Sequence, residues 1–492
     1  MGFVLTIDQG TSSTRSLVMD ESGNIRSSFQ LEHEQIFPNP AWVEHNPLEI
    51  IENVRHTSAK ALQNVNLDWG DVDVIGITNQ RETVIAWDKQ TGKPLYNAIV
   101  WQCRRTAPIV QNLKEEGFDE VFLKKTGLVL DAYFSGTKMK WMIENVPKVK
   151  TALGKGTLQF GTIDSWLIYS LTGSHTTDAS NASRTLLYNI HSGDWDEELC
   201  EILGVPIETL PKVVPNKSES FGILEQNGSQ VPITGVLGDQ QAALFGHGAF
   251  ETGNIKCTYG TGNFVLMNTG STPVSSNKGL LTTVGWQIEN KLTYALEGSV
   301  FVTGAALLWL RDKLGLIKDY SEIDGLAEGA NKNGSVFFVP AFVGLGAPHW
   351  DSTARGMIIG LTRDSGKEDI VYSTLESIAY QTDDLLKIMA EEAKINLNEL
   401  RVDGGITNSN LLMQRQADIS RLDVVIPSNL ETTAFGAGLM AGLGHLWDSI
   451  DEIRKLNPAE KRYKPKSKLE DEEARKIFWK KAVEKSQNWI EF

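Results

Sequence analysis

A strand that runs into a Gly-Thr turn occurs twice in this chain, and the two copies are separated by about half of its 492 residues. In the first copy, the apolar residues 3–7 lead into an acid and a turn at residues 8–15. In the second copy, residues 254–259 lead into Gly260-Thr261-Gly262. The β-branched and aromatic residues of both runs suit buried strands. The spacing predicts two similar α/β halves that each present one such turn, although a Gly-Thr pair is too short to establish a repeat by itself.

The first turn carries groups that suit a phosphate. Its backbone N–H groups, its hydroxyls and the guanidinium of Arg15 can donate charge-assisted hydrogen bonds to phosphate oxygens. Asp8 can position a magnesium ion through water, because Mg2+ takes few carboxylates and keeps part of its water shell. An ordinary hairpin tip rich in Ser and Thr would have the same composition, so the turn alone leaves both interpretations open.

Length, charge and cysteine usage limit the class of protein. A chain of 492 residues is too long for one hydrophobic core and predicts two large domains. The formal net charge of −15 argues against a nucleic-acid or anionic-membrane partner. Three isolated cysteines give neither a disulfide framework nor a metal-binding spacing. With no signal peptide and no apolar run of membrane-spanning length, these features predict a cytoplasmic protein without membrane insertion.

Three further predicted strands end in polar residues, namely Arg81-Glu82, Asp239 and Asp403-Gly404-Gly405. Ligands of open α/β sheets bind beyond the carboxyl ends of the strands. The alternatives are a surface ion pair at residues 81–82 and a helix N-cap at Asp239. The repeated occurrence of an acid at a strand end favours a functional carboxylate at Asp239.

Helix signals are clearest in three segments. Asn46 and Pro47 predict the start of a helix at about residues 48–64, since Asn favours the N-cap and Pro the first turn. A Gly/Ala-rich helix is expected at 433–444, where small side chains allow close approach of a ligand or a neighbouring backbone. The amphipathic pattern at 469–483 predicts a C-terminal helix with a solvated face.

Several common nucleotide-binding and catalytic motifs are absent from the sequence. There is no Gly-x-x-x-x-Gly-Lys-[Ser/Thr] loop, no Gly-x-Gly-x-x-Gly after a strand, no Gly-x-Ser-x-Gly elbow and no His-Arg-Asp loop. The eight histidines show no metal-ligand clustering. What remains are strand-end turns rich in Gly, Thr and Asp, which suit nucleotide phosphates held by backbone amides and magnesium.

Seven motifs occur in a fixed order along the chain. They are Asp8-Gln9-Gly10-Thr11, Asn79-Gln80-Arg81-Glu82, Val100-Trp101-Gln102-x-Arg104-Arg105, Asp131-Ala132-Tyr133-Phe134-Ser135, Gly238-Asp239-Gln240-Gln241, Tyr259-Gly260-Thr261-Gly262 and Asp403-Gly404-Gly405. This ordered set resembles the FGGY family of carbohydrate kinases. The resemblance spans residues 3 to about 443 and is strongest to members that phosphorylate glycerol. It implies an α/β fold of two ribonuclease-H-like domains, as in actin and hexokinase, with mixed sheets flanked by helices and the active site in the inter-domain cleft. The implied limits are 1–248 for the N-terminal domain, 249–445 for the C-terminal domain and 446–492 for a helical tail packed on the latter.

The resemblance also assigns roles to individual residues. It implies that Asp239 is the general base and that glycerol is held by Arg81, Glu82, Trp101, Tyr133, Asp239, Gln240 and Phe264. ATP is expected to contact Thr11, Ser12, Ser13, Arg15, Gly260, Thr261, Gly304, Gly405 and Ser409, with Asp8 positioning Mg2+ through water. The implied product is sn-glycerol 3-phosphate, and the implied assembly is a homodimer or homotetramer.

The sequence departs from the family pattern at a few positions. Leu308 and Ser409 stand where many members have Gln and Asn, so the adenine contacts follow less directly than the phosphate contacts. Residues 225–231 lack the Gly- and Lys-rich loop that binds fructose 1,6-bisphosphate in some members, which argues against that inhibitor. Two alternatives stay open: a related kinase for another small polyol or sugar, and an actin-like ATP-binding scaffold without transfer activity.

Overall fold

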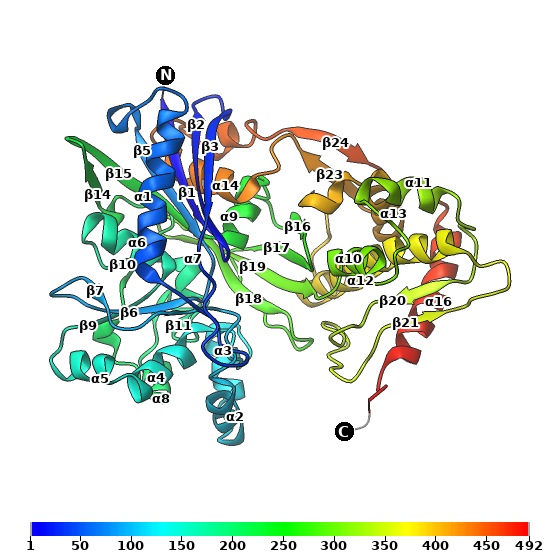
Figure 1. Ribbon diagram of the computed structural model, residues 1–492, viewed down its shortest axis with the longest axis horizontal. Helices are drawn as coiled ribbons and strands as arrows, with labels where there is room; N and C mark the ends of the chain where they lie inside the picture. Colours follow the sequence, from blue (N-terminus) through cyan, green and yellow to red (C-terminus); the bar gives the residue numbers. More distant parts are fainter. Residues whose placement is uncertain (1, 491–492) are drawn as a thin grey trace.

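Two mixed sheets organise the fold, one in each half of the chain (Figure 1). The structure is a computed structural model that describes residues 2–490. The first sheet has the strand order β14-β15-β5-β1-β2-β3. Its strands are β1 (Phe3–Gln9), β2 (Ser13–Asp20), β3 (Ile25–Glu32), β5 (Val74–Asn79), β14 (Ile223–Gln226) and β15 (Ser229–Gly238).

The second sheet has the order β18-β19-β17-β16-β22-β23-β24. Its strands are β16 (Ile255–Tyr259), β17 (Asn263–Gly270), β18 (Leu281–Ile288), β19 (Lys291–Val300), β22 (Glu399–Asp403), β23 (Asp423–Pro427) and β24 (Ala459–Tyr463).

The two sheets share one pairing scheme. β1 pairs antiparallel with β2 and parallel with β5, β5 pairs parallel with β15, and β15 pairs antiparallel with β14. In the same way β16 pairs antiparallel with β17 and parallel with β22, β22 pairs parallel with β23, and β23 pairs antiparallel with β24 at that edge. Each sheet begins with a hairpin whose turn is Gly-Thr followed by one small residue. The predicted pair of similar α/β halves is confirmed. The sheet of the second half differs from that of the first by one extra strand, β18, at the opposite edge.

Helix α1 (Pro47–Gln63) covers one face of the first sheet where the sequence predicts it. The side chain of Asn46 accepts a hydrogen bond from Leu48 N (3.0 Å), which satisfies an otherwise free donor of the first turn. Ile50, Val54 and Ala61 are buried on one side of the helix. They join a core with Leu5 and Ile7 of β1, so the 3.6-residue pattern fixes which side of α1 faces the sheet.

The rest of the first half forms a layer beside this sheet (Figure 1). It holds a second small sheet of β4 (Glu44–His45), β6 (Val84–Asp88), β7 (Lys93–Pro94), β8 (Ala98–Ile99) and β9 (Leu158–Thr162). Its helices are α2 (Ala107–Glu115), α3 (Asp119–Thr126), α4 (Ser135–Asn145), α5 (Pro147–Gly154), α6 (Ile163–Thr172), α7 (Ala179–Ala182) and α8 (Glu197–Leu203).

In the second half, helices flank the sheet and the C-terminal helix lies against them. These elements are α10 (Gly304–Asp312), α11 (Ile323–Glu328), α12 (Lys367–Ala393), α13 (Asn410–Ser420) and α16 (Leu469–Ser486), with the short strands β20 (Phe337–Val339) and β21 (Met357–Ile359). Trp479 of α16 is buried, stacks on Tyr380 and donates its indole N–H to Asp384 (2.7 Å). The helix predicted at 469–483 therefore has a buried face as well as a solvated one.

The Gly/Ala-rich helix α14 (Thr432–Gly442) packs at backbone distance against α9 (Asp239–Gly246). A Cβ added at Gly436 would lie 1.9 Å from the carbonyl oxygen of Ala242, and one at Gly246 would lie 2.1 Å from that of Thr432. A Cβ at Gly76 of β5 would lie 2.5 Å from the carbonyl oxygen of Ala437. The close approach predicted from the small residues is thus to neighbouring backbone, and it brings a late segment of the chain back onto the first sheet (Figure 1). None of the helices between residues 2 and 490 has the length and apolar character needed to cross a membrane.

Candidate active site

Each of the two Gly-Thr turns is closed by a backbone hydrogen bond from its first glycine. Gly10 N donates to the carbonyl oxygen of Ser13 (2.9 Å), and Gly260 N donates to that of Gly262 (3.0 Å). Within residues 2–490, the backbone N–H groups of Thr11 and Thr261 have no hydrogen-bond acceptor. Each turn therefore presents an unsatisfied donor at the end of a buried strand, as an anion-binding turn requires.

The second turn lies against glycines from two other elements. Gly304, the first residue of α10, donates its N–H to Gly260 O (3.0 Å), and a Cβ there would lie 2.5 Å from the same oxygen. Gly404 has a φ of 94°, and a Cβ on it would lie 2.2 Å from Tyr259 O. Only glycine fits at either position. A Cβ at Gly405 would meet no atom within 4 Å, so space is open beside that residue.

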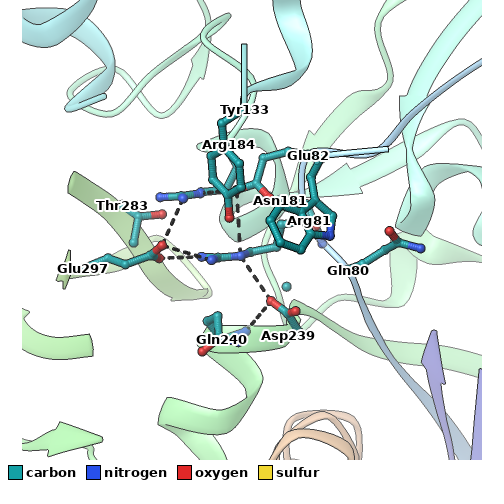
Figure 2. A network of polar contacts seen from close by, with 12 residues as sticks. Gln80, Arg81, Glu82, Tyr133, Asn181, Arg184, Asp239, Gln240, Thr283 and Glu297 are labelled. Carbon is teal, nitrogen blue, oxygen red and sulfur yellow. Dashed lines mark hydrogen bonds and ion pairs between the residues drawn. The ribbon is translucent and has the colours of Figure 1, made fainter. Parts of the chain in front are cut away.

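Arg81 is the centre of a buried charge network (Figure 2). Its Nη1 and Nη2 lie 2.6 and 3.0 Å from the two carboxylate oxygens of Glu297, and its Nε lies 3.1 Å from Asp239 Oδ1. Arg184 extends the network, since its Nε donates to Glu82 Oε1 (2.7 Å) and its Nη2 to Glu297 Oε1 (3.1 Å). Because Glu297 is on β19 and the other residues belong to the first half, the network joins the two halves.

The network sets the charge state of its acids. Burial alone would raise the pKa of Glu297, but the adjacent Arg184 and Arg81 lower it to about 2. Burial raises the pKa of Asp239 above its ordinary value, against the opposing effects of Arg81 and of the Gln240 N–H, which donates to Asp239 Oδ1 (2.7 Å). Asp239 is thus a stronger base than a solvated aspartate, while Glu297 stays ionised and holds the arginines.

Two aromatic residues link this network to the first turn. The rings of Trp101 and Tyr133 meet edge to face with centroids 5.5 Å apart. The indole N–H of Trp101 donates to Thr11 Oγ1 (2.9 Å), and its backbone N–H donates to Thr83 Oγ1 (3.2 Å). Trp101 therefore contacts the first Gly-Thr turn on one side and the segment that carries Arg81 and Glu82 on the other.

Asp8 lies at the end of β1, beside the same turn. Burial raises its pKa to about 7, Arg15 opposes the shift, and the negative charge of Asp239 adds to it. Two carboxylates that repel each other suit a cation placed between or beside them. Among residues 2–490 no group of three or more His, Cys, Asp or Glu side chains could hold a metal alone. This donor set fits Mg2+, which keeps water and phosphate oxygens among its ligands.

Comparison with known proteins gives matches along nearly the whole chain. Residues 3–246 match the N-terminal domain model, and residues 255–445 the C-terminal domain model, of the FGGY family of carbohydrate kinases. The chain belongs to the FGGY family. It is 52% identical to "Glycerol kinase 2" of Thermotoga maritima, over 99% of each chain, and 50% identical to "Glycerol kinase" of Thermococcus onnurineus, over 99% of this chain and 98% of that one.

Solved structures of FGGY kinases have the same fold. The crystal structure of Plasmodium falciparum glycerol kinase with ADP superposes with a TM-score of 0.95 at 39% identity, covering 100% of this chain and 99% of that chain. A ligand-bound xylulose kinase from Lactobacillus acidophilus gives 0.87 at 22% identity, with 98% and 97% covered, which is a likeness of fold. The predicted two-domain α/β fold and family are therefore confirmed.

The residues predicted from the sequence fall into two sets in this FGGY fold. Direct contacts join Arg81 with Glu82 and Asp239, and join Trp101 with Tyr133 and Thr11. The remaining ones make contacts outside these two groups. The side chain of Gln240 accepts a hydrogen bond from Lys256 Nζ, and Phe264 on β17 lies opposite Ser299 on β19. In the first half, the hydroxyl of Ser13 accepts a hydrogen bond from Gln30, and Arg15 forms an ion pair with Glu431. Ser409 caps α13, since its hydroxyl accepts a hydrogen bond from Leu412 N.

Three charged residues of this region are absent from the sequence-based prediction: Arg184, Lys256 and Glu297. Lys256 is buried on β16, and its Nζ contacts Gln240 Oε1 and Thr258 Oγ1. A signal exists for Glu297, which follows the apolar residues 294–296 in a strand and so places a charge at a buried position. Arg184 has no comparable signal, because it lies outside any regular element.

Proposed function

We propose that the protein transfers the γ-phosphoryl group of ATP to a terminal hydroxyl of glycerol and forms sn-glycerol 3-phosphate. The observation that carries this proposal is the identity of 52% and 50%, over nearly full length, to proteins named glycerol kinase. The chemistry of the buried network supports it. A polyol offers hydroxyls that each donate and accept, and the network supplies both acceptors and donors.

On the substrate side, the hydroxyls of glycerol form hydrogen bonds with Arg81, Glu82 and Asp239. The phenol of Tyr133 and the amide of Gln240 provide further hydrogen bonds to glycerol. Trp101 and Phe264, both half-buried, pack on its carbon chain. A site that buries paired polar groups rejects an analogue that lacks a matching hydroxyl, because those groups would then stay unpaired. Selectivity for a small polyol follows from this combination of hydrogen-bonding groups and packed aromatic rings.

On the nucleotide side, the free N–H groups of Thr11 and Thr261 bind phosphate oxygens from opposite halves, together with Ser12, Ser13, Arg15 and Gly260. Gly405 leaves room for the adenosine, Gly304 brings the start of α10 close to the second turn beside it, and Ser409 stands at the start of the next helix. The similar Plasmodium falciparum enzyme was solved with ADP, which supports ATP as the donor. Asp8 positions Mg2+, which supplies neutralisation of phosphate charge when bound.

Asp239 acts as the base. Its carboxylate accepts the proton of the terminal hydroxyl while that oxygen bonds to the γ-phosphorus and the bond to ADP breaks. The raised pKa of Asp239 favours this proton transfer, and Arg81 Nε at 3.1 Å orients the carboxylate. The other residues bind and align, since phosphoryl transfer depends mainly on positioning and charge stabilisation.

The proposal extends to the organisation of the chain. It divides the chain into 1–248, 249–445 and a tail from 446, in keeping with the limits of the two family models. The protein is also proposed to act in the cytoplasm as a homodimer or homotetramer. The three free, buried cysteines are compatible with a reducing compartment.

A substrate panel tests the proposal. Purified protein with MgATP is assayed for ADP release on glycerol, dihydroxyacetone, erythritol and xylulose, and we expect the highest kcat/KM on glycerol. Asp239→Asn should lower kcat by a factor of about 100 to 10,000 while both ligands still bind. A higher kcat/KM on xylulose would assign the protein to another sugar, and binding of both ligands without transfer would refute kinase activity.

A further inference from the structure

Lys138 of α4 is fully buried, and its ammonium group has an unusual set of partners. Its Nζ donates to three successive backbone carbonyls, those of Ala132 (2.8 Å), Tyr133 and Phe134 (3.0 Å). An ammonium has three N–H donors and no acceptor, so these contacts use its full capacity. All three carbonyls belong to the segment that presents Tyr133.

The position of Lys138 is unfavourable for a cation by itself. It lies in the first turns of α4, where the helix dipole repels positive charge, and burial lowers its pKa to about 7. Ala132 and Tyr133 precede the helix, so their carbonyl oxygens accept no helical hydrogen bond. The carbonyl oxygens compensate the cost of burying the charged amine, and their hydrogen bonds to the amine in turn fix their positions.

The segment is fixed from the other side by Asp131. Its carboxylate accepts from the backbone N–H of Tyr133 (2.8 Å) and pairs with Arg104 (2.6 and 3.1 Å). Ser135, the first residue of α4, donates to the carbonyl oxygen of Glu82 (3.1 Å). The start of α4 therefore sets the places of both Tyr133 and Glu82, while Lys138 lies behind them.

We propose that Lys138 is a positioning residue for substrate recognition: by gathering the carbonyls of residues 132–134 it holds the phenol of Tyr133 against Trp101 and toward the polyol. Lys138 touches neither substrate nor nucleotide. The inference rests on the proposed function, since it concerns the glycerol half of that site and leaves the phosphate half unchanged.

Lys138→Met tests the role, because it keeps the stem and removes every donor. We expect KM for glycerol to rise about tenfold or more, the size of effect that follows the loss of a hydrogen bond to substrate, with KM for ATP nearly constant. The matched control is Lys140→Met on the same helix, whose ammonium pairs with Glu144 at the surface (3.0 Å) and whose loss should leave both KM values unchanged. Lys138→Gln retains two donors and should fall between Lys138→Met and the unmodified protein. It also provides the measurement if Lys138→Met does not fold.

A double-mutant cycle with Tyr133→Phe separates positioning from general stabilisation. If Lys138 acts through Tyr133, the double variant should have a glycerol KM close to that of the worse single variant. Multiplied effects, or equal rises in KM for glycerol and ATP, would overturn the inference. An inactive unmodified protein would instead refute the proposed function. An active one whose Lys138 variants match it would refute the inference alone.

Discussion

Replacing Glu297 by Gln removes the charge that holds Arg81 and Arg184 while keeping the shape of the side chain. Glu297 is 5% exposed and makes three contacts of 2.6 to 3.1 Å with the two guanidinium groups. Its pKa of about 2, against an ordinary value of 4.5, corresponds to about 3 kcal/mol of stability. Breaking a buried ion pair from one side costs about 3–5 kcal/mol, which agrees with this value.

We therefore expect Glu297→Gln to lower the free energy of unfolding by about 3 kcal/mol at pH 7. The sign of its pH dependence follows from the depressed pKa. The contribution is complete above about pH 4.5 and is lost as the pH falls toward 2, so the difference between variant and unmodified protein should shrink over that range. Urea titrations followed by circular dichroism, at several pH values, measure it.

Glu391→Gln is the control, because Glu391 forms an exposed pair with Lys278 and should contribute nothing measurable. The reasoning would be refuted if Glu297→Gln lost less than about 1 kcal/mol at pH 7, the size of an ordinary surface effect. Glu82 and Asp239 would then suffice to hold the two arginines. A difference that did not change between pH 7 and the acid range would also contradict it.

One further prediction concerns the hydrogen bond between Trp101 and the first turn, and another concerns the packing of α14. Trp101→Phe keeps a ring but removes the donor to Thr11, so kcat/KM for ATP should fall about tenfold, and an unchanged value would mean that Thr11 needs no such support. Gly436→Ala should destabilise the fold by about 3 kcal/mol or more, because its Cβ would lie 1.9 Å from Ala242 O. Gly325→Ala, in a helix with no atom within 4 Å, should be neutral or stabilising in the same thermal melts, and equal losses would refute the packing argument.

The sequence predicts those parts of the structure that depend on local signals. Helix α1 appears within a residue or two of its expected limits, because capping residues act on their immediate neighbours. The repeated Gly-Thr turn indicated two similar halves, but so short a match could not establish the duplication, which the shared strand pairing shows. In contrast, the limits of a short strand such as β20 (Phe337–Val339) have no local signal, since an apolar run alone does not determine where pairing ends.

The candidate site was predictable on one side only. Arg81, Glu82 and Asp239 follow strands, and strand ends meet at one edge of a sheet. Glu297 and Arg184 reach them from elements far along the chain, and no local pattern specifies such a contact. Lys138 belongs to none of the motifs, and its role depends on a side chain that folds back toward the start of its own helix.

The glycine-packed contact between α9 and α14 limits how the two halves can move. Backbones that touch without intervening side chains cannot move closer together, which makes this contact a candidate pivot for a relative motion of the halves. α9 begins with Asp239, which places the proposed base close to this contact. The turns at Gly10 and Gly260 follow β1 of the first sheet and β16 of the second. A hinge in this place would let the two turns proposed to bind the nucleotide move apart and together while the carboxylate proposed as the base stays nearly still.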